Sequence, residues 1–402
     1  MNTCCILGLG YIGLPTAVVL ARSGFDVIGV DVNPQVVDTI NEGRIHIVEP
    51  DLDEAVASVV TSGALSARLT PVPADVFLIA VPTPFISSND GLPQPNIEYV
   101  LSAARSIAPL LCAGNLVLLE STSPVGTTKK VAEILSSLSG LRLDEFNIAY
   151  CPERVLPGQI LRELVVNDRV VGGLTPSAAD AGCSFYSTFC KGRILATNDR
   201  TAELVKLTEN SFRDVNIAFA NELSLVCDHL DINVRDLIGL ANHHPRVNVL
   251  QPGCGVGGHC IAVDPWFIAA AAPHCTPLIQ AARRVNDNKT QWVIEQVKAR
   301  AVALEDDLGR PARIGCLGLA FKPDVDDLRE SPALQITTEL LAIGLDVLAC
   351  EPNLSDHPTI KLYGLNHVLA EADLLLFLVA HRSFKNLNLS GHFVFDICGV
   401  TD

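Results

Sequence analysis

The first 150 residues alternate short apolar runs with segments of helical periodicity. The segments between the runs, such as LPTAVVLARSG and IEYVLSAARSIAPLL, have their apolar residues at helical spacing. Near-continuous apolar runs separated by helices are typical of strands buried on both faces of a parallel sheet. We therefore predict such a sheet, with strands at 4–10, 26–31, 75–81, 116–121 and 146–151.

The pattern changes at about residue 201 and returns after residue 310. A stretch from Thr201 to 230, with Glu203 in its first turn, contains no Gly or Pro and predicts a long helix. Strand-like runs then follow at 313–321, 344–353, 372–380 and 393–399. We expect an α/β fold of two Rossmann-like parallel-sheet domains joined by a central long-helix dimerisation region, divided at 1–200, 201–300 and 301–402.

A weak internal repeat supports the second Rossmann-like domain. GFDVIGVDVN (24–33) and GLDVLACEPN (344–353) align without gaps, and Asp31 is matched by Glu351. The later copy carries an insertion, FKPDVDDLRES (321–331), after its glycine turn. Ligands of open α/β sheets bind at this edge, so the insertion is a natural place for a second binding function.

Composition narrows the class of protein. The formal net charge of −16 argues against binding to nucleic acid or to an anionic membrane surface. No apolar run approaches the ~18 residues of a membrane span, and the N-terminus lacks the basic region of a signal peptide. Thirteen cysteines without a CxxC pair favour reduced thiols in the cytoplasm over disulfides or a zinc site.

GLGYIG (8–13) is a G-x-G-x-x-G motif between a predicted strand and a predicted helix. Gly8 permits a tight turn, Gly10 lets a pyrophosphate approach the backbone, and Gly13 lets helix and strand pack closely. Asp31 lies 18 residues beyond Gly13, where an acid binds a ribose 2′-hydroxyl and repels a 2′-phosphate. The motif indicates NAD rather than NADP, and FAD or a nucleotide sugar is the alternative of the same geometry.

Polar residues also fall where a catalytic cleft would need them. Lys206, Asn210 and Arg213 have i, i+4 and i+7 spacing on one helical face, where Lys could stabilise an oxyanion or accept a proton. A solvated helix surface explains the same spacing. His244 and Arg246 in HHPRVN (243–248) could bind an anion, or be exposed loop residues, and they lack the partners of a metal site.

Two strand ends contribute further candidates. ESTSPVG (120–126) and CPERV (151–155) place Thr122, Glu153 and Arg154 at the expected ligand edge. A Ser/Thr cluster at this point is also consistent with a helix N-cap.

Cys260 is the candidate nucleophile. It lies in GCGVGGHCIAVDP (253–265), four residues before Asp264, which could orient a water or accept a proton. The glycines would let the loop approach a bulky ligand. A buried apolar cysteine is the alternative, and Cys254 in the same loop, without a neighbouring acid, serves as the inert comparison.

These motifs in this order resemble the nucleotide-sugar 6-dehydrogenase family, which includes the UDP-glucose and GDP-mannose dehydrogenases. The resemblance covers nearly the whole chain, through ILGLGYIGLP, AVPTP, ESTSPVGTT, YCPERVLPG, RTAELVKLTENSFRDVNIAFANE, GVGGHCIAVDP and GLAFKPDVDDLRESPA. RIHIVEPDL (44–52) and the His before Cys260 are similar to the branch that acts on UDP-N-acetylhexosamines. Cys254 departs from the family, whose members commonly have Pro there.

The resemblance implies a four-electron oxidation of a UDP-sugar at C6 with NAD, for surface polysaccharide synthesis. UDP-N-acetyl-D-mannosamine is the expected substrate, with UDP-N-acetylglucosamine or UDP-glucose as alternatives and a non-catalytic nucleotide-binding regulator as a remote one. It assigns NAD binding to 1–200, the catalytic Lys206 and Cys260 to 201–300, and UDP binding to 301–402, in a homodimer or higher homo-oligomer.

The family's site residues carry over by motif. The implied catalytic residues are Cys260, Lys206, Asn210, Asp264, Thr122 and Glu153. The implied NAD contacts are Gly8, Gly10, Tyr11, Ile12, Gly13, Asp31, Thr83, Thr122 and Arg329. The implied substrate contacts are Arg154, Val155, Lys206, Asn210, Arg213, His244, Arg246, Gly257 and Lys322, with His244 and Arg246 supplied by a neighbouring subunit.

Overall fold

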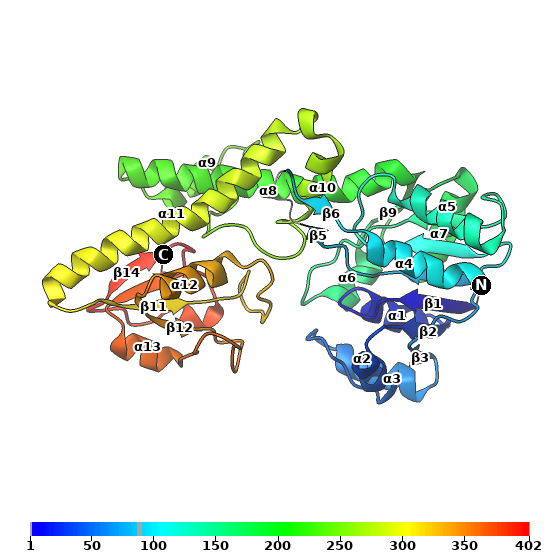
Figure 1. Cartoon of the computed structure of the whole chain (residues 1–402), viewed down its shortest axis with the longest axis horizontal. Coiled ribbons are helices and arrows are strands. Elements are labelled where there is room, and N and C mark those ends of the chain that lie inside the picture. Colours follow the sequence, from blue (N-terminus) through cyan, green and yellow to red (C-terminus); the bar gives the residue numbers. More distant parts are fainter. Residues whose placement is uncertain (1, 87–90, 402) are drawn as a thin grey trace. The chain divides into compact units, whose positions relative to one another are not determined.

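The computed structural model describes residues 2–86 and 91–401. The chain forms two compact units, one of Met1–Thr208 with Trp266–Ala271 and one of Glu209–Pro265 with Ala272–Asp402. Two helices of 32 residues each, α8 (Asp199–Leu230) and α11 (Pro277–Leu308), are the longest elements of the described chain (Figure 1). The expected α/β fold of two Rossmann-like domains joined by long helices is confirmed.

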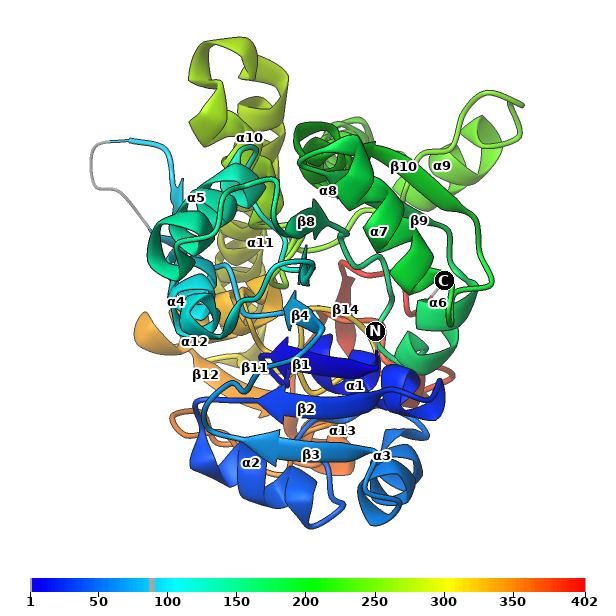
Figure 2. The same ribbon diagram turned by 90° about the vertical axis from the view of Figure 1, so that its right-hand side faces the viewer.

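The first unit is built on an eight-stranded sheet of order β10-β9-β8-β7-β4-β1-β2-β3. Neighbouring strands run parallel except for β8 and β9, which pair antiparallel. Figure 2 shows β4, β1, β2 and β3 lying one beside the next. The strands are β1 (Thr3–Leu7), β2 (Asp26–Val30), β3 (Leu65–Arg68), β4 (Val76–Ile79), β7 (Leu116–Leu119), β8 (Asn147–Tyr150), β9 (Arg169–Gly173) and β10 (Ile194–Asn198).

Three of these strands, β3, β9 and β10, were not predicted. The side chains of β10 are half-buried or exposed, and those of β3 alternate between buried and more exposed positions, so neither segment is continuously apolar. β9 begins with Arg169 and ends in two glycines, a composition that resembles a loop. Strands with such compositions escape a search for apolar runs.

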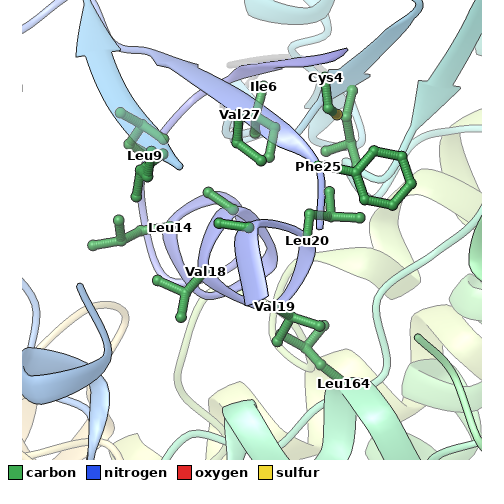
Figure 3. Packing of buried hydrophobic residues seen from close by; sticks show 14 of the residues in the cluster. Cys4, Ile6, Leu9, Leu14, Val18, Val19, Leu20, Phe25, Val27 and Leu164 are labelled. Carbon is green, nitrogen blue, oxygen red and sulfur yellow. The ribbon is translucent and has the colours of Figure 1, made fainter. Parts of the chain in front are cut away.

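Helices cover both faces of this sheet. On one face are α1 (Gly13–Arg22), α2 (Pro34–Asn41), α3 (Leu52–Thr61), α6 (Ile160–Val166) and α7 (Pro176–Tyr186). On the other are α4 (Glu98–Ile107), the 3-10 turn η1 (Ala108–Leu110) and α5 (Thr127–Ser139). Figure 3 shows Leu14 of α1 beside Leu9, and Leu20 of α1 near Phe25, in the first core. A small antiparallel pair, β5 (Phe85–Ile86) and β6 (Gln94–Pro95), follows β4.

The second unit contains a four-stranded, fully parallel sheet of order β12-β11-β13-β14. Residues of α11 and α12 share one core with its strands, and α13 shares another. The remaining elements of this unit are α9 (Val234–Ala241), η2 (Pro273–Cys275), β11 (Arg313–Leu317), α12 (Pro332–Ala342), β12 (Asp346–Cys350), α13 (Leu365–Glu371), β13 (Leu374–Phe377), η3 (Arg382–Phe384) and β14 (Phe393–Asp396). The helix α10 (Asp264–Ala271) begins in the second unit, and its residues from Trp266 belong to the first.

The internal repeat extends to the hydrogen bonds of the two glycine turns. Gly8 and Gly318 both have left-handed backbones, with φ of 90° and 93°. Asp31 Oδ2 accepts a hydrogen bond from the Leu9 N–H at 3.1 Å, and Glu351 Oε2 accepts one from the Leu319 N–H at 2.8 Å. The two sheet domains therefore share the same turn at the end of their first strand.

The acid of the second turn is closed off from solvent. Glu351 is buried, and its Oε2 also accepts from the Ala320 N–H (3.0 Å) and pairs with His381 Nε2 (3.1 Å). Burial alone would raise the pKa of Glu351, but hydrogen bonds from His381, Leu319 and Asn353 lower that pKa to about 2. In this copy the carboxylate holds its own loop and is not available to a ribose.

Within the described ranges, no helix has both the length and the apolar composition needed to cross a membrane.

Candidate functional site

The three glycines of the first turn have different surroundings. A Cβ on Gly8 would lie 2.6 Å from the Ala80 carbonyl oxygen, and one on Gly13 would collide with the Gly8 carbonyl oxygen. A Cβ on Gly10 would meet no atom within 4 Å. Gly8 and Gly13 are therefore required by the fold, while the open space at Gly10 fits the close approach of a dinucleotide pyrophosphate.

The other predicted NAD residues of the first unit line the same edge. Asp31 is half-buried just after β2, and its Oδ1 accepts from the Asn33 N–H at 3.0 Å. Tyr11 and Ile12 are half-buried at the start of α1, and Thr83 is half-buried after β4. These residues fit a bound NAD, because polar and partly exposed groups flank the open position at Gly10.

Thr122 lies in a segment bound to the loop that follows β4. Ser121 Oγ donates to the Val81 carbonyl oxygen at 2.7 Å, and Ser123 Oγ donates to the Ser121 carbonyl oxygen at 2.9 Å. The next helix, α5, is not capped by this Ser/Thr cluster. Glu203 of α8 accepts from the N–H groups of Gly126 (2.6 Å) and Thr128 (2.7 Å), so the alternative of Thr122 as an N-cap is excluded.

Glu153 belongs to a buried charged cluster. Its Oε2 accepts from Arg169 Nη2 at 3.1 Å, and its Oε1 accepts from the Arg154 N–H at 2.7 Å. Burial, only partly offset by Arg169, raises the pKa of the neighbouring Glu120 to about 7. Both oxygens of Glu153 are therefore engaged, and the carboxylate holds the 152–155 turn in place.

The predicted substrate residues of this turn are half-buried. The guanidinium of Arg154 donates from Nη1 to the Asp168 carbonyl oxygen at 3.1 Å. Val155 packs against the core that contains α1.

The predicted polar stripe of α8 differs from the observed one. Lys206 is half-buried in the first unit, Asn210 is buried in the second, and Arg213 is exposed. The buried polar side chains that continue from Asn210 are Asp214 and Asn221. The buried polar side chains of α8 thus do not include Arg213, which is exposed.

Cys260 lies in the turn that leads into α10 and is partly exposed. Its carbonyl oxygen accepts from the N–H groups of Val263 (3.0 Å) and Asp264 (2.8 Å). Asp264, the first residue of α10, is buried, and its Oδ2 accepts from Asn210 Nδ2 at 2.5 Å. The structure therefore brings Cys260, Asp264 and Asn210 into one region of the second unit.

Cys254 has a different environment in the same loop. It is buried, its Sγ donates to the Leu378 carbonyl oxygen (3.6 Å), and burial raises the pKa of its thiol to about 12. Such a thiol is inert toward substrates.

The glycines before Cys260 allow the loop to pack closely against other parts of the same chain. A Cβ on Gly255 would lie 2.6 Å from Thr290 Oγ1, one on Gly257 would collide with the Glu330 carbonyl oxygen, and one on Gly258 would lie 2.8 Å from the Phe321 ring. The Gly258 N–H also donates to the Arg329 carbonyl oxygen at 3.0 Å. The expectation that these glycines serve a bulky ligand is therefore revised, because their Cβ positions are taken by α11 and the 321–332 segment.

The 321–331 insertion carries two predicted site residues. Lys322 is half-buried with Nζ 5.7 Å from the centre of the Phe321 ring, and the exposed Arg329 binds Asp327 through Nε and Nη2. The other predicted anion-binding pair, His244 and Arg246, is exposed in the loop after α9. Among the described residues no group of three His, Cys, Asp or Glu side chains could hold a metal ion.

The charged and amide side chains that support these loops were missed in the sequence. Glu203 was interpreted only as a first-turn acid of its helix, and Arg169 stood in an unrecognised strand. The signal available for Asp214 and Asn221 was the presence of polar residues at helical spacing from Asn210, which equally describes a surface.

Models of one protein family match three consecutive parts of the chain. They are the NAD binding domain (residues 2–190), the central domain (200–288) and the UDP binding domain (315–402) of the UDP-glucose/GDP-mannose dehydrogenase family.

Individual relatives match over the full length. The chain is 54% identical to a UDP-N-acetyl-D-mannosamine dehydrogenase of Escherichia coli (strain K12), covering 99% of each chain. It is 50% identical to an NDP-N-acetyl-D-galactosaminuronic acid dehydrogenase of Ralstonia nicotianae, covering 99% of this chain and 96% of the relative. A solved UDP-D-ManNAc dehydrogenase of Pyrococcus horikoshii superposes with a TM-score of 0.91 at 39% identity, covering 100% of this chain and 96% of the other. The chain therefore belongs to the UDP-glucose/GDP-mannose dehydrogenase family and is an NAD-dependent dehydrogenase, as its motifs predict.

Proposed function

We propose that the chain oxidises UDP-N-acetyl-D-mannosamine at C6 to UDP-N-acetyl-D-mannosaminuronate. The conversion of CH₂OH to a carboxylate removes four electrons, consumes one water and releases three protons. NAD⁺, when bound, supplies the hydride acceptor for both oxidations, so that two NADH form per sugar.

The observation that carries the proposal is the grouping of a partly exposed thiol with a buried amide–carboxylate pair. Cys260 precedes Asp264 by four residues, and Asp264 is bound by Asn210 at 2.5 Å. Relatives with UDP-N-acetyl-D-mannosamine dehydrogenase in their names, at 53% and 54% identity, support the choice of sugar.

In the proposed mechanism the C6 alcohol is first oxidised to the aldehyde. Lys206 and Asn210 stabilise the oxyanion at C6 in this step and relay the proton of the alcohol. The Cys260 thiolate adds to the C6 aldehyde, a C–S bond forms, and the oxygen takes up a proton to give a thiohemiacetal. Its oxidation leaves a thioester. Asp264 and Thr122 position the water that attacks the thioester carbon. Glu153 assists this step, the C–S bond breaks, and the thiolate is regenerated with the carboxylate product.

We assign NAD binding mainly to 1–200, catalysis mainly to 201–300 and UDP binding mainly to 301–402, with single contacts that cross these bounds. We assign NAD contacts to the Gly8–Gly13 turn, Asp31, Thr83, Thr122 and Arg329. We assign substrate contacts to Lys206, Asn210, Arg154, Val155, Arg213, His244, Arg246, Gly257 and Lys322.

We propose a homodimer formed through α8. Phe212, Phe219 and Val226, at seven-residue spacing on this helix, are 66%, 51% and 47% exposed. Apolar side chains repeated on one exposed helical stripe favour burial against another helix. Sedimentation of the wild type against Phe219→Glu measures this: a dimer that becomes a monomer is expected, and a monomeric wild type would contradict it.

The thirteen cysteines are all free, which supports a reducing compartment such as the cytoplasm. There the uronate would enter surface polysaccharide synthesis, and a chromosomal deletion should remove the uronic-acid sugar from that polysaccharide.

The decisive experiment compares UDP-sugars with purified protein and NAD⁺. We expect two NADH per UDP-N-acetyl-D-mannosamine, with slower oxidation of UDP-N-acetylglucosamine and UDP-glucose. UDP-N-acetylgalactosamine belongs in the panel because of the Ralstonia relative. A ratio of one NADH per sugar with release of aldehyde would refute the double oxidation, and NAD binding without any reduction would favour the regulator.

Cysteine variants test the nucleophile. Cys260→Ser should keep NAD binding and stall turnover, whereas Cys254→Ser should turn over normally because its thiol is buried and protonated. Normal turnover by Cys260→Ser would contradict the covalent mechanism.

A further inference from the structure

A buried polar network joins α8 to α11 within the second unit. Asp214 and Asn221 come from α8, and Arg283 and Asn286 come from α11. All four side chains are buried, with exposed fractions of 0% for the first two, 3% for Arg283 and 0% for Asn286. Buried amides and charges are costly unless their hydrogen bonds are made. The hydrogen bonds of this network extend to the backbone of Gly253.

The hydrogen bonds of the network run in one direction. The Gly253 N–H donates to Asn221 Oδ1 at 2.9 Å, and Asn221 Nδ2 donates to Asn286 Oδ1 at 2.9 Å. Asn286 Nδ2 then donates to Asp214 Oδ1 at 2.8 Å, and Arg283 Nη1 donates to the same oxygen at 2.7 Å.

Each amide consequently fits in one orientation only. A backbone donor stands at one end and a carboxylate acceptor at the other, so turning either amide would place two donors or two acceptors together. The network thus specifies where the Gly253 N–H must lie, and not merely that two helices pack.

Gly253 begins the loop that leads to Cys260. The next residue is held as well, because Thr290 Oγ1 of α11 donates to the Cys254 carbonyl oxygen at 3.0 Å. At the other end of the loop, Asp264 is held by Asn210 of α8. The segment from Gly253 to Asp264 is therefore held at its start by α8 and α11 and at its end by α8.

We propose that Asn221 is a positioning residue for Cys260. It binds the Gly253 N–H and so fixes the start of the cysteine loop, while Asn286 and the Asp214–Arg283 ion pair hold its amide in place. The inference rests on the proposed function of Cys260 as nucleophile. Positioning of this kind matters because a displacement of about 1 Å at a reacting group can cost on the order of 10²-fold in rate.

The first test breaks the network at Asn221. Asn221→Asp retains an acceptor for the Gly253 N–H but turns an acceptor toward Asn286 Oδ1. Asn221→Ala removes both side-chain hydrogen bonds of Asn221, the one from the Gly253 N–H and the one to Asn286. We expect kcat to fall about 10- to 100-fold in Asn221→Asp and in Asn221→Ala.

A second readout separates this proposal from the proposed function. The rate at which iodoacetamide alkylates Cys260, followed by mass spectrometry of its peptide, needs no turnover. We expect it to rise several-fold in Asn221→Asp and Asn221→Ala, because the start of the loop is no longer held. NAD⁺ affinity should be unchanged in both.

Ser224→Ala is the matched control. Ser224 accepts from Lys289 Nζ at 2.9 Å across the same two helices and donates to the Asn221 carbonyl oxygen at 2.5 Å, so its loss lowers Tm but leaves the side-chain hydrogen bonds of Asn221 in place. Equal Tm losses in Ser224→Ala and Asn221→Ala, with the same kcat and alkylation rate as wild type, would reduce Asn221 to a structural role and overturn the proposal. If no UDP-sugar is oxidised while the alkylation pattern holds, the proposed function fails and the positioning inference stands.

Discussion

Asn210 Nδ2 lies 2.5 Å from Asp264 Oδ2, and both side chains are buried. This bond joins the long helix α8 to the first residue of α10, four residues beyond Cys260. A carboxylate taken out of water needs such a donor, so the pair fixes the direction in which Asp264 presents its other oxygen.

Loss of this bond should reduce catalysis. Asn210→Ala removes the amide donor to Asp264 and, under the proposed mechanism, one group that stabilises the oxyanion. We expect kcat to fall on the order of 10²-fold, measured by NADH absorbance at saturating UDP-sugar. Ser211→Ala is the control, since Ser211 is the next buried polar residue and its Oγ has no hydrogen-bond partner among the described residues; a similar fall there would point to general disturbance of α8.

In the glycine turn of the first unit, we predict that one substitution lowers NAD⁺ affinity and another lowers thermal stability. Gly10→Val adds a side chain where no protein atom lies within 4 Å, so Tm should be unchanged while NAD⁺ affinity falls roughly tenfold or more, about 1.4 kcal/mol. Gly13→Ala should instead lower Tm, because its Cβ collides with the Gly8 carbonyl oxygen. Calorimetric titration with NAD⁺ checks the first variant, and full affinity in Gly10→Val would place the dinucleotide elsewhere.

The cysteine loop predicts opposite results for the same substitution at two positions. Gly258→Ala adds a Cβ at φ +81° and 2.8 Å from the Phe321 ring, which should cost about 1–3 kcal/mol and lower kcat. Gly253→Ala meets only the Gly255 carbonyl oxygen at 3.9 Å and should be tolerated. Urea unfolding and steady-state rates measure both, and equal effects of the two changes would contradict the packing described for the loop.

From the lowered pKa of Glu351 we predict that the folded chain loses stability in acid. Its pKa in the folded chain is lowered from the ordinary 4.5 to about 2, so its contribution is complete above pH 4.5 and disappears as pH falls toward 2. The difference corresponds to about 3 kcal/mol.

Glu351→Gln isolates this contribution. Urea unfolding of both proteins across pH 2 to 6 should show a difference that is largest near pH 6 and shrinks toward pH 2. His381 Nε2 lies 3.1 Å from the carboxylate, so a parallel series with His381→Gln shows how much of the difference depends on this partner. A difference independent of pH would contradict the lowered pKa.

The strands that carry the glycine turns could be predicted because they are buried on both faces, and burial demands continuous apolar runs. The family could be predicted because its motifs are specific and follow one another along the chain. The predicted need for glycine at Gly8 and Gly13 agrees with the structure, because their neighbours leave no room for a Cβ. The strands β3, β9 and β10 could not be predicted, since partial exposure or paired glycines remove the apolar signal.

The sequence by itself determined the α/β class, the repeat of Asp31 by Glu351 and the identity of the residues that accompany Cys260. Only the tertiary structure decided which polar residues of α8 face inward, that Glu203 caps α5, and that the loop glycines pack against Phe321 and Thr290. The reason is physical: local periodicity records which face of an element is apolar, whereas the partner of a buried polar group stands far along the chain. Asn221 and Asn286 are 65 residues apart in sequence and 2.9 Å apart across two helices.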